Sequence, residues 1–447
     1  MTSESIEIGR CAGVDAASAA PARPARSMSR NATWNFAGNA AYAACQWGML
    51  VVLSKLGTAA MVGRLVLAVA VCAPVFALCN LALRGVLATD AKEEFRFAEY
   101  LRLRLLTTAG ALVVVAGIAI VGWRWEVAAV ILAFAAAKGL DAVSDVFHGL
   151  FWQHERLDYV AQSLLLKGPL SLAALAVGVV WTGSLMGGVV GVGVAYGLVL
   201  MGYDLRRGRA VRAEGSHPAG ASGQIEAARL RQLAFLAFPL GLAWTLAALN
   251  RSVPRYFIEG RCGEAELGVF GAIAALMIAG DTVMQAVGNA ASPRLATYYA
   301  SGNAGGFRRL LLRLAAAGTL VGLGGVAVAV VGGGPLLAWL YRPEYAKHAS
   351  LFVALMIVGA IGYADVYLAY GMLSARYLRP QPALSAGGVA ITGVLCWLLV
   401  PRHGLMGAVI AMGVSGLVQA GGKLCCTLHA LGALRAASPR RKDAETG

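Results

Sequence analysis

Apolar runs of about 20 residues recur along almost the entire chain, and this feature constrains the fold more than any other. A helix needs a run of that length to cross the hydrocarbon core of a bilayer. Hydrophobic residues make up 58% of the sequence and charged residues 14%, which excludes an ordinary soluble domain. The sequence therefore predicts an all-α polytopic membrane protein with about 12 transmembrane helices. These helices are predicted near residues 32–55, 62–86, 105–122, 126–150, 158–181, 184–203, 234–257, 265–290, 310–332, 349–374, 383–400 and 404–427.

The longest connection between predicted helices runs from Asp204 to Arg231 and divides the chain into two groups of six helices. Its composition is basic at first and then rich in Gly, Ser and Ala, which is typical of a linker. The predicted organisation is a disordered cytoplasmic tail at 1–30, an N-lobe at 31–204, a cytoplasmic linker at 205–232, a C-lobe at 233–428 and a cytoplasmic tail at 429–447.

The distribution of Lys and Arg predicts the orientation of the chain in the membrane. With Lys138, Lys167 and Lys423 set aside as intramembrane residues, the two tails and the even-numbered loops hold 26 of these residues, and the other loops hold 9. Positive residues accumulate in cytoplasmic loops, so both termini are predicted to lie in the cytoplasm. The net charge of +15 thus belongs to short loops and not to a nucleic-acid groove with stacking aromatics, and no nucleic-acid partner is expected.

The sequence contains no motif for catalysis, a cofactor or a metal. The six histidines are dispersed, the eight cysteines lack metal-ligand spacing, and no Walker A sequence is present. The glycine-rich stretch at 187–197 lies inside an apolar run with no preceding strand, so it indicates close helix packing and not a phosphate loop. We therefore expect a protein that is not an enzyme and not an ATP-driven pump.

A short pattern recurs at the same place in both predicted lobes. YLRLRLLTTAGAL, residues 100–112, matches LLLRLAAAGTL, residues 310–320, at the start of the third helix of each lobe. The match places Arg104 and Arg313 at corresponding positions. The same order and orientation predict a parallel repeat, in which a pseudo-two-fold axis along the membrane normal relates the two six-helix lobes.

A second set of matching positions concerns the fourth helix of each lobe. Asp145 is followed by Arg156 after eleven residues, and Asp365 is followed by Arg376 at the same distance. We interpret these four residues as a repeated frame at the cytoplasmic side, with a role in gating or ion coupling. Asp281, a further carboxyl group inside an apolar run, is another candidate for ion coupling.

The predicted helix 126–150 ends in a stripe of polar residues. Lys138, Asp141, Asp145, His148 and Trp152 are separated by three or four residues, so they share one face of a helix. An ionisable group at that depth costs about 3 kcal/mol or more, and such groups normally face a bundle interior or a wet cavity. The stripe therefore predicts a polar path through the protein.

Lys138 and Asp141 allow two interpretations. In the first, they form a neutralising pair within their helix and are purely structural. In the second, they line a central cavity between the lobes, together with Lys167 of the next helix, and the two lysines contact an anionic headgroup. Two carboxylates and one lysine on the stripe leave a charge to be balanced, and Lys167 is the nearest cation along the chain.

Further polar residues within apolar runs are candidates for the same cavity. Asn39 and Gln46 share one face of the first helix, where they either contact substrate or hold neighbouring helices together. Arg251 and Arg255 either bind an anion or extend to the outer interface. Arginines near the predicted cytoplasmic helix ends are interpreted as anchors that touch anionic lipid: Arg84, Arg102, Arg104, Arg294, Arg308 and Arg309.

Four segments resemble the polysaccharide flippases of the multidrug/oligosaccharidyl-lipid/polysaccharide exporter (MOP) superfamily. They are NATWNFAGNAAYAACQWGMLVVLSKLG, GLFWQHERLDYVAQSLLLKGPLSL, VPRYFIEGRCGEAELGVFGAIAAL and ASPRLATYYASGN. The resemblance extends over about residues 29–430 and rests on diffuse patterns and not on a catalytic signature.

The resemblance implies two lobes of six helices around a cavity, and alternating access that moves an undecaprenyl-diphosphate-linked oligosaccharide to the outer leaflet. It places the sugar and diphosphate in a cationic cavity and leaves the lipid tail in the bilayer. It also places Gln153, Glu155, Arg156 and Asp158 in the cytoplasmic gate region. Relatives that extrude drugs share this architecture, so the superfamily does not determine the substrate.

The leading hypothesis from the sequence is a flippase for lipid-linked oligosaccharide in the bacterial inner membrane, serving polysaccharide or lipopolysaccharide assembly. Its expected partners are the lipid-linked oligosaccharide, membrane lipids and polysaccharide polymerase or export machinery. The first alternative is a cation-coupled exporter of drugs or metabolites, in which Asp141 and Asp145 carry a cationic substrate. The second is a membrane glycosyltransferase or ligase, which the short outer loops disfavour.

Overall fold

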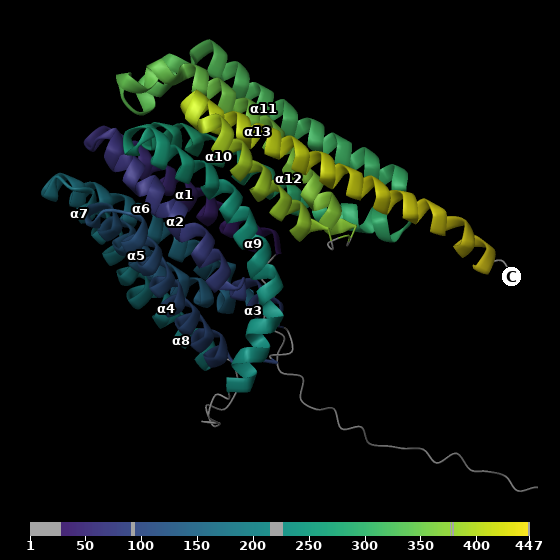
Figure 1. The fold of residues 1–447 in the computed structure, drawn as a ribbon. Coiled ribbons are helices and arrows are strands. Elements are labelled where there is room, and N and C mark those ends of the chain that lie inside the picture. The colour runs from purple at the N-terminus through teal and green to yellow at the C-terminus, as the bar shows by residue number, and fades with distance from the viewer. Residues whose placement is uncertain (1–27, 91–93, 215–226, 376, 378–379, 446–447) are drawn as a thin grey trace, which may run out of the picture.

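The structure is a computed structural model that describes residues 28–90, 94–214, 227–375, 377 and 380–445, and within these ranges it contains helices and no strand (Figure 1). A helix satisfies every backbone polar group internally, which a lipid environment requires. The elements are α1 (Met28–Leu56), α2 (Ala59–Asn80), α3 (Leu83–Thr89), α4 (Phe97–Gly122), α5 (Trp125–Gln153), α6 (Leu157–Thr182), α7 (Leu185–Val199), the π-helical turn η1 (Leu200–Asp204), α8 (Leu205–Glu214), α9 (Ala227–Cys262), α10 (Glu264–Ala300), α11 (Ala304–Leu340), the 3-10 helix η2 (Pro343–His348), α12 (Ala349–Ser374) and α13 (Gln381–Glu445).

The long element α13 is a pair of antiparallel helices. Its backbone leaves the helical conformation at Gly404, where φ is 56° and ψ is −133°. The hydroxyl of Ser415 donates a hydrogen bond of 3.0 Å to the carbonyl oxygen of Gly388, so the segments before and after Gly404 lie side by side. Eleven stretches of the described residues are long and apolar enough to span a membrane, and the stretch Gln381–Gly432 folds back on itself. The twelve predicted spans are therefore confirmed.

The helices form two lobes with the same internal pairing. In the N-lobe, α1 packs against α6, α2 and α4 pack against α5, and α5 packs against α7. In the C-lobe, α9 packs against the first part of α13, α10 and α11 pack against α12, and α12 packs against the second part of α13. In both lobes the first helix packs against the fifth, the second and third pack against the fourth, and the fourth packs against the sixth. This shared order confirms the predicted parallel repeat.

The two lobes meet at the side where α1 ends and α2 begins, which we call the closed side. There α2 packs against α10 so tightly that a β-carbon on Gly63 would overlap the carbonyl oxygen of Glu264. The guanidinium of Arg64 lies 2.7 Å from the Glu264 carboxylate across the same contact. The indole N–H of Trp47 on α1 donates to the hydroxyl of Tyr341, which follows α11, at 3.2 Å. Figure 1 shows the ribbons of the two lobes converging here and diverging toward the opposite, N-terminal side, where α1 begins.

The segments outside the predicted lobes are more helical than expected. Residues 1–27 of the predicted tail at 1–30 lie outside the described residues, and its last three residues belong to α1, which begins at Met28. Within the predicted linker 205–232, α8 continues directly from η1 and α9 begins at Ala227. Val211 of α8 is buried against the N-lobe, which explains why this basic segment is helical. In the predicted tail 429–447, α13 continues to Glu445.

Candidate functional site

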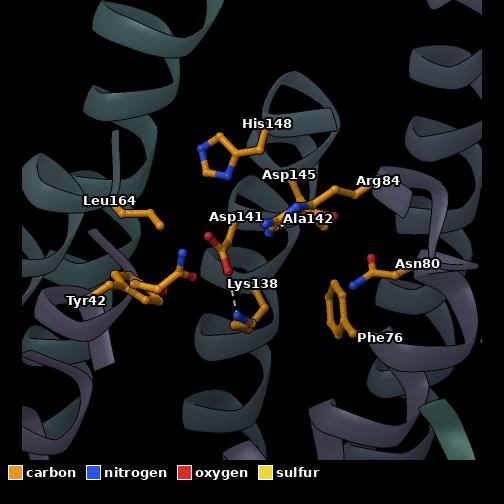
Figure 2. Close-up of a pocket in the computed structure, with 11 residues that line it drawn as sticks. Tyr42, Phe76, Asn80, Arg84, Lys138, Asp141, Ala142, Asp145, His148 and Leu164 are labelled. Carbon is orange, nitrogen blue, oxygen red and sulfur yellow. Dashed lines mark hydrogen bonds and ion pairs between the residues drawn. The ribbon is translucent and has the colours of Figure 1, made fainter. Parts of the chain in front are cut away.

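A polar cavity of about 210 Å³ lies inside the N-lobe, among α1, α2, α3, α5 and α6 (Figure 2). Four members of the predicted stripe on α5 line this cavity, and the prediction that they share one face is confirmed. Trp152, the fifth member, lies 5.2 Å from the guanidinium of Arg84, which stacks over its ring. The lining residues are Asn39, Tyr42, Phe76, Asn80, Arg84, Lys138, Asp141, Ala142, Asp145, His148 and Leu164.

Asp141 lies between the two lysines that the sequence singled out. The ammonium group of Lys138 donates to Oδ2 at 2.6 Å, and that of Lys167 donates to Oδ1 at 2.9 Å. The Lys138 side chain is 34% exposed and borders the cavity, whereas the Lys167 side chain is fully buried behind Asp141. The structure thus brings the three residues together, with Lys138 as the lysine that reaches open space.

Asp145 is held by two arginines that the sequence analysis interpreted as lipid anchors. Arg84 lies 3.4 Å from one of its carboxylate oxygens, and Arg104 lies 3.2 Å from the other. The Arg104 side chain is fully buried and also donates to the amide oxygen of Asn80. For Arg84 and Arg104 the anchor prediction is wrong, because α4 places Arg104 inside the bundle and α3 aims Arg84 at the cavity.

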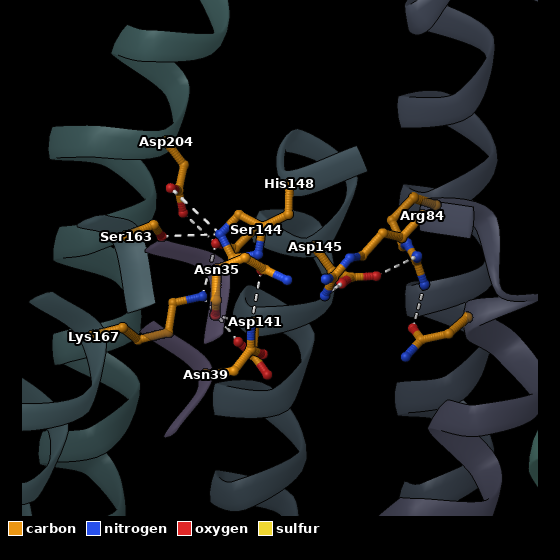
Figure 3. A network of polar contacts seen from close by, with 12 residues as sticks. Asn35, Asn39, Arg84, Asp141, Ser144, Asp145, His148, Ser163, Lys167 and Asp204 are labelled. Carbon is orange, nitrogen blue, oxygen red and sulfur yellow. Dashed lines mark hydrogen bonds and ion pairs between the residues drawn. The ribbon is translucent and has the colours of Figure 1, made fainter. Parts of the chain in front are cut away.

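A second polar cluster adjoins the first on the side of α7, and Figure 3 shows both together. Lys167 donates to the hydroxyl of Ser144 at 2.8 Å, and that hydroxyl donates to Oδ2 of Asp204. Nε2 of His148 lies 3.0 Å from the hydroxyl of Ser163 and 3.8 Å from Oδ1 of Asp204. These five side chains are all buried, so the cluster is a polar core between α5, α6 and η1.

The polar residues of α1 have different roles in the structure. Asn39 lines the cavity, and its amide group donates to the carbonyl oxygen of Asn35 at 2.7 Å. Gln46 donates to the hydroxyl of Tyr196 on α7 at 2.9 Å, and the hydroxyl of Tyr42 lies 3.1 Å from the same group. Gln46 therefore joins α1 to α7, while Asn39 reaches the cavity.

In the C-lobe the predicted residues do not gather into one cluster. Arg251 lies 3.7 Å from Asp281 on α10, and its side chain is 69% exposed. Arg255 lies one turn after Arg251, on the same face of α9. It makes no hydrogen bond or ion pair with any residue that the structure describes. Asp365 is paired at 2.5 Å with Lys423 on α13. Arg376, the fourth residue of the predicted frame, lies outside the described residues.

The predicted gate region lies at the N-terminal side, where α5 ends and α6 begins. Gln153 donates to the backbone carbonyl of Asp90 at 2.9 Å. The guanidinium of Arg156 lies 3.4 Å from Asp158 and 3.8 Å from the ring centre of Tyr159. Glu155, between the two helices, has a positive φ of 56°. These contacts hold the α5–α6 turn against the N-lobe.

Asp204 and Lys423 are the polar residues whose setting the sequence analysis missed. Asp204 follows the predicted helix 184–203 directly and begins the predicted connection Asp204–Arg231, but the π-helical turn η1 directs its side chain into the bundle. A carboxylate adjacent to an apolar run was the available signal. Lys423 was set aside as intramembrane without a partner, and its partner is Asp365. No group of His, Cys, Asp and Glu in the described part of the chain is arranged to hold a metal ion.

No family model matches the chain. A curated protein of Staphylococcus aureus, the capsular polysaccharide biosynthesis protein CapF, is 22% identical over 395 residues, which cover 88% of this chain and 97% of CapF.

Among solved structures, an inward-facing MATE-family multidrug resistance transporter of the MOP superfamily aligns with a TM-score of 0.66 at 14% identity, over 88% of this chain and 95% of the other. An outward-facing MATE-family multidrug resistance transporter of the MOP superfamily aligns with a TM-score of 0.62 at 13% identity, over 91% of this chain and 96% of the other. A MOP-superfamily transporter from Pyrococcus furiosus, described by the reverse polarity of its binding pocket, aligns with a TM-score of 0.60 at 15% identity, over 91% and 96%. The chain is thus a multi-pass membrane protein with the fold of MOP-superfamily transporters, and over most of its length it is similar to a capsular polysaccharide biosynthesis protein.

Proposed function

We propose that the protein moves a polyprenyl-diphosphate-linked oligosaccharide across the bacterial inner membrane. The diphosphate is the only strongly charged part of such a substrate, so its recognition requires cations that are not already neutralised by the protein. The similarity to a capsular polysaccharide biosynthesis protein over most of both chains supports this substrate class.

The observation that carries the proposal is the state of Arg255. Asp141, Asp145, Asp281 and Asp365 each face at least one lysine or arginine. Arg255 has no acceptor among the described residues, although it lies within a membrane-spanning helix. An arginine in that setting requires an anion, and a diphosphate offers oxygens that match the two-pronged geometry of a guanidinium.

The N-lobe adds a second cationic contact. The partly exposed ammonium of Lys138 borders the cavity beside Arg84, and each of them is tied to only one carboxylate. We propose that Lys138 and Arg84 contact the diphosphate or the first sugar, with Asn39 as a hydrogen-bonding group for sugar hydroxyls. Lys167 then acts indirectly by holding Asp141 in place.

The transport cycle that we propose is alternating access, starting from the arrangement seen here. Positive residues predominate on the N-terminal side, so we assign that side to the cytoplasm. The lobes are joined on the closed side by the contacts Arg64–Glu264 and Trp47–Tyr341, and we assign this side to the outer face. In this arrangement the substrate enters from the cytoplasmic leaflet, and rearrangement of the lobes exposes it to the other leaflet.

Transport of defined substrates by the purified full-length protein tests the proposal. Proteoliposomes are loaded with fluorescent polyprenyl-diphosphate-oligosaccharide, and the fraction that becomes accessible in the outer leaflet is followed over time. We expect flipping by the wild type and none by empty vesicles. A matched polyprenyl-monophosphate sugar tests whether the diphosphate is required. If both lipids remain on their own side, the proposal is wrong.

The second candidate is a cation-coupled exporter of drugs or metabolites, which the fold shared with MATE transporters favours. A cationic drug needs a carboxylate that is accessible and unpaired, and Asp141 and Asp145, the residues considered for this role, are each bonded to two cations. Accumulation of cationic dyes in cells with and without the protein separates the candidates. A lower accumulation in cells that contain the protein favours the exporter.

A further inference from the structure

Asp204 is a buried carboxyl group that the proposed transport of glycan does not use. It is the last residue of η1, and its side chain is completely buried. A single π-helical turn inside a helix often marks a functional site, because it changes which side chain points inward. Oδ2 accepts a hydrogen bond from Ser144, whereas Oδ1 is buried and accepts none from the described residues. A buried carboxylate oxygen without a donor is costly, so this arrangement requires an explanation.

Asp204 differs from the other carboxylates of the N-lobe in its neighbours. Asp141 is bonded to two lysines and Asp145 to two arginines, which neutralises both. No lysine or arginine of the described chain lies within ion-pair distance of Asp204. Its nearest titratable neighbour is His148, at 3.8 Å from the unsatisfied Oδ1. A pair made of one carboxyl and one imidazole can be neutralised or charged by a single proton.

We propose that Asp204 and His148 form a proton-binding site that is linked to the cavity of the N-lobe. His148 lines the cavity and also faces Asp204, so it provides the route by which a proton reaches the buried carboxyl. Ser163 and Ser144 hold the imidazole and the carboxyl by hydrogen bonds. A metal cation fits less well, because the ammonium of Lys167 lies 2.8 Å from the hydroxyl of Ser144 that such an ion would need.

The linkage to the cavity passes through Lys167. Its ammonium group bonds to Asp141 at the cavity and to Ser144, which in turn bonds to Asp204. The charged groups around this site are Lys138 and Asp141 on α5, Lys167 on α6, and Arg84 on α3. While Asp204 is ionised, the positive charges of Lys138 and Lys167 are balanced by the negative charges of Asp141 and Asp204. When a proton neutralises Asp204, only the negative charge of Asp141 remains. The net charge around the cavity then becomes more positive by one.

A proton on this site therefore favours an anion in the cavity, and by reciprocity a bound anion favours the proton. This second step rests on the proposed function, since it assumes that the cavity accepts a diphosphate. The proton site itself does not depend on the identity of the substrate, so the two parts can be tested separately.

The first experiment is an infrared titration of the full-length protein in lipid nanodiscs. The carboxyl C=O stretching band appears only when an aspartate is protonated. We expect a buried carboxyl band that titrates in the wild type, is lost in Asp204→Asn, and persists in Glu126→Gln, a variant of an exposed carboxyl on α5, the helix that carries His148. Replacement of the imidazole in His148→Gln is expected to change the proton affinity of the site about tenfold. A titrating band that survives Asp204→Asn overturns the proposal, as does the absence of any titrating band.

Asparagine has the size of aspartate and can still accept from Ser144, so Asp204→Asn is expected to fold. If it does not, Ser144→Ala and His148→Gln decide: a shifted midpoint in both supports the site, and an unshifted midpoint in both overturns it. The second experiment measures the binding of inorganic pyrophosphate by calorimetry as a function of pH. We expect the affinity of the wild type for pyrophosphate to depend on pH through the Asp204 site, in addition to the ionisation of pyrophosphate itself. This contribution of Asp204 should be absent in Asp204→Asn. A titrating carboxyl without pyrophosphate binding would retain the proton site and contradict the proposed diphosphate substrate.

Discussion

Arg104 and Asp145 form an ion pair in the interior of the N-lobe, with Nη2 of the arginine 3.2 Å from Oδ2 of the aspartate. The Arg104 side chain is fully buried and also donates to Asn80. The arginine thus joins α4 to α5 and α2 at a depth where an unpaired charge would be very costly. Each residue belongs to a repeated pattern of the sequence, but the two patterns are separate and do not predict that Arg104 and Asp145 pair.

Loss of the arginine should destabilise the protein strongly. Arg104→Ala leaves Asp145 with Arg84 alone and leaves Asn80 without its donor, so we expect the free energy of unfolding to fall by about 3–5 kcal/mol. Arg313→Ala, at the corresponding position of the C-lobe, removes an exposed side chain and should change it by less than about 0.5 kcal/mol. Denaturant unfolding of both variants in the same detergent measures the difference. Equal effects would contradict the structural role of Arg104.

The two arginines also show what the sequence could predict and what it could not. Apolar run length and i, i+4 spacing were sufficient for the twelve spans, the two lobes and the polar face of α5. Whether an arginine at a helix end points to lipid or into the bundle depends on neighbouring helices, and the repeated pattern was the same for Arg104 and Arg313. In the C-lobe, Asp365 is paired with Lys423 and not with an arginine, and the repeated pattern does not indicate this difference.

The candidate site was predictable to a similar degree. The association of Lys138, Asp141 and Lys167 followed from charge balance alone, and the structure contains it. Asp204 could not be placed, because a π-helical turn inserts one residue into the helix and redirects all side chains that follow. A prediction based on a period of 3.6 residues therefore loses its register at η1.

The reversal of α13 depends on one glycine. Gly404 has φ 56° and ψ −133°, a conformation that residues with a β-carbon rarely adopt, at a cost of about 1–3 kcal/mol. We expect Gly404→Ala to lower the free energy of unfolding by that amount. Gly393→Ala is the matched control, since Gly393 lies within the helix and a β-carbon there meets open space. Alanine should stabilise that site by up to about 1 kcal/mol. Variants with the same stability would show that the reversal does not need glycine.

The proposed role of Arg255 predicts an effect on binding without an effect on stability. Arg255→Gln removes a guanidinium that bonds to none of the described residues, so the protein should unfold at the same temperature or a higher one. Loss of charged hydrogen bonds of about 1.5–3 kcal/mol should weaken pyrophosphate binding about 10- to 100-fold. Arg402→Gln, which removes an exposed arginine, should leave binding unchanged. A destabilised Arg255→Gln variant with unchanged binding would assign the arginine to structure.

The contact between Arg64 and Glu264 predicts how the closed side can be opened. The pair joins α2 to α10 at 2.7 Å and is partly exposed, so it contributes about 1 kcal/mol, enough to change the populations of two arrangements several-fold. Arg64→Gln should therefore increase hydrogen exchange in 59–66 and 264–271. Arg124→Gln, at an exposed arginine on the same side of the bundle, should not. The double exchange Arg64→Glu with Glu264→Arg should restore the wild-type exchange rates, because it rebuilds the pair in reverse. If the double variant exchanges as fast as Arg64→Gln, the lobes are held together by the packing at Gly63 and not by this ion pair.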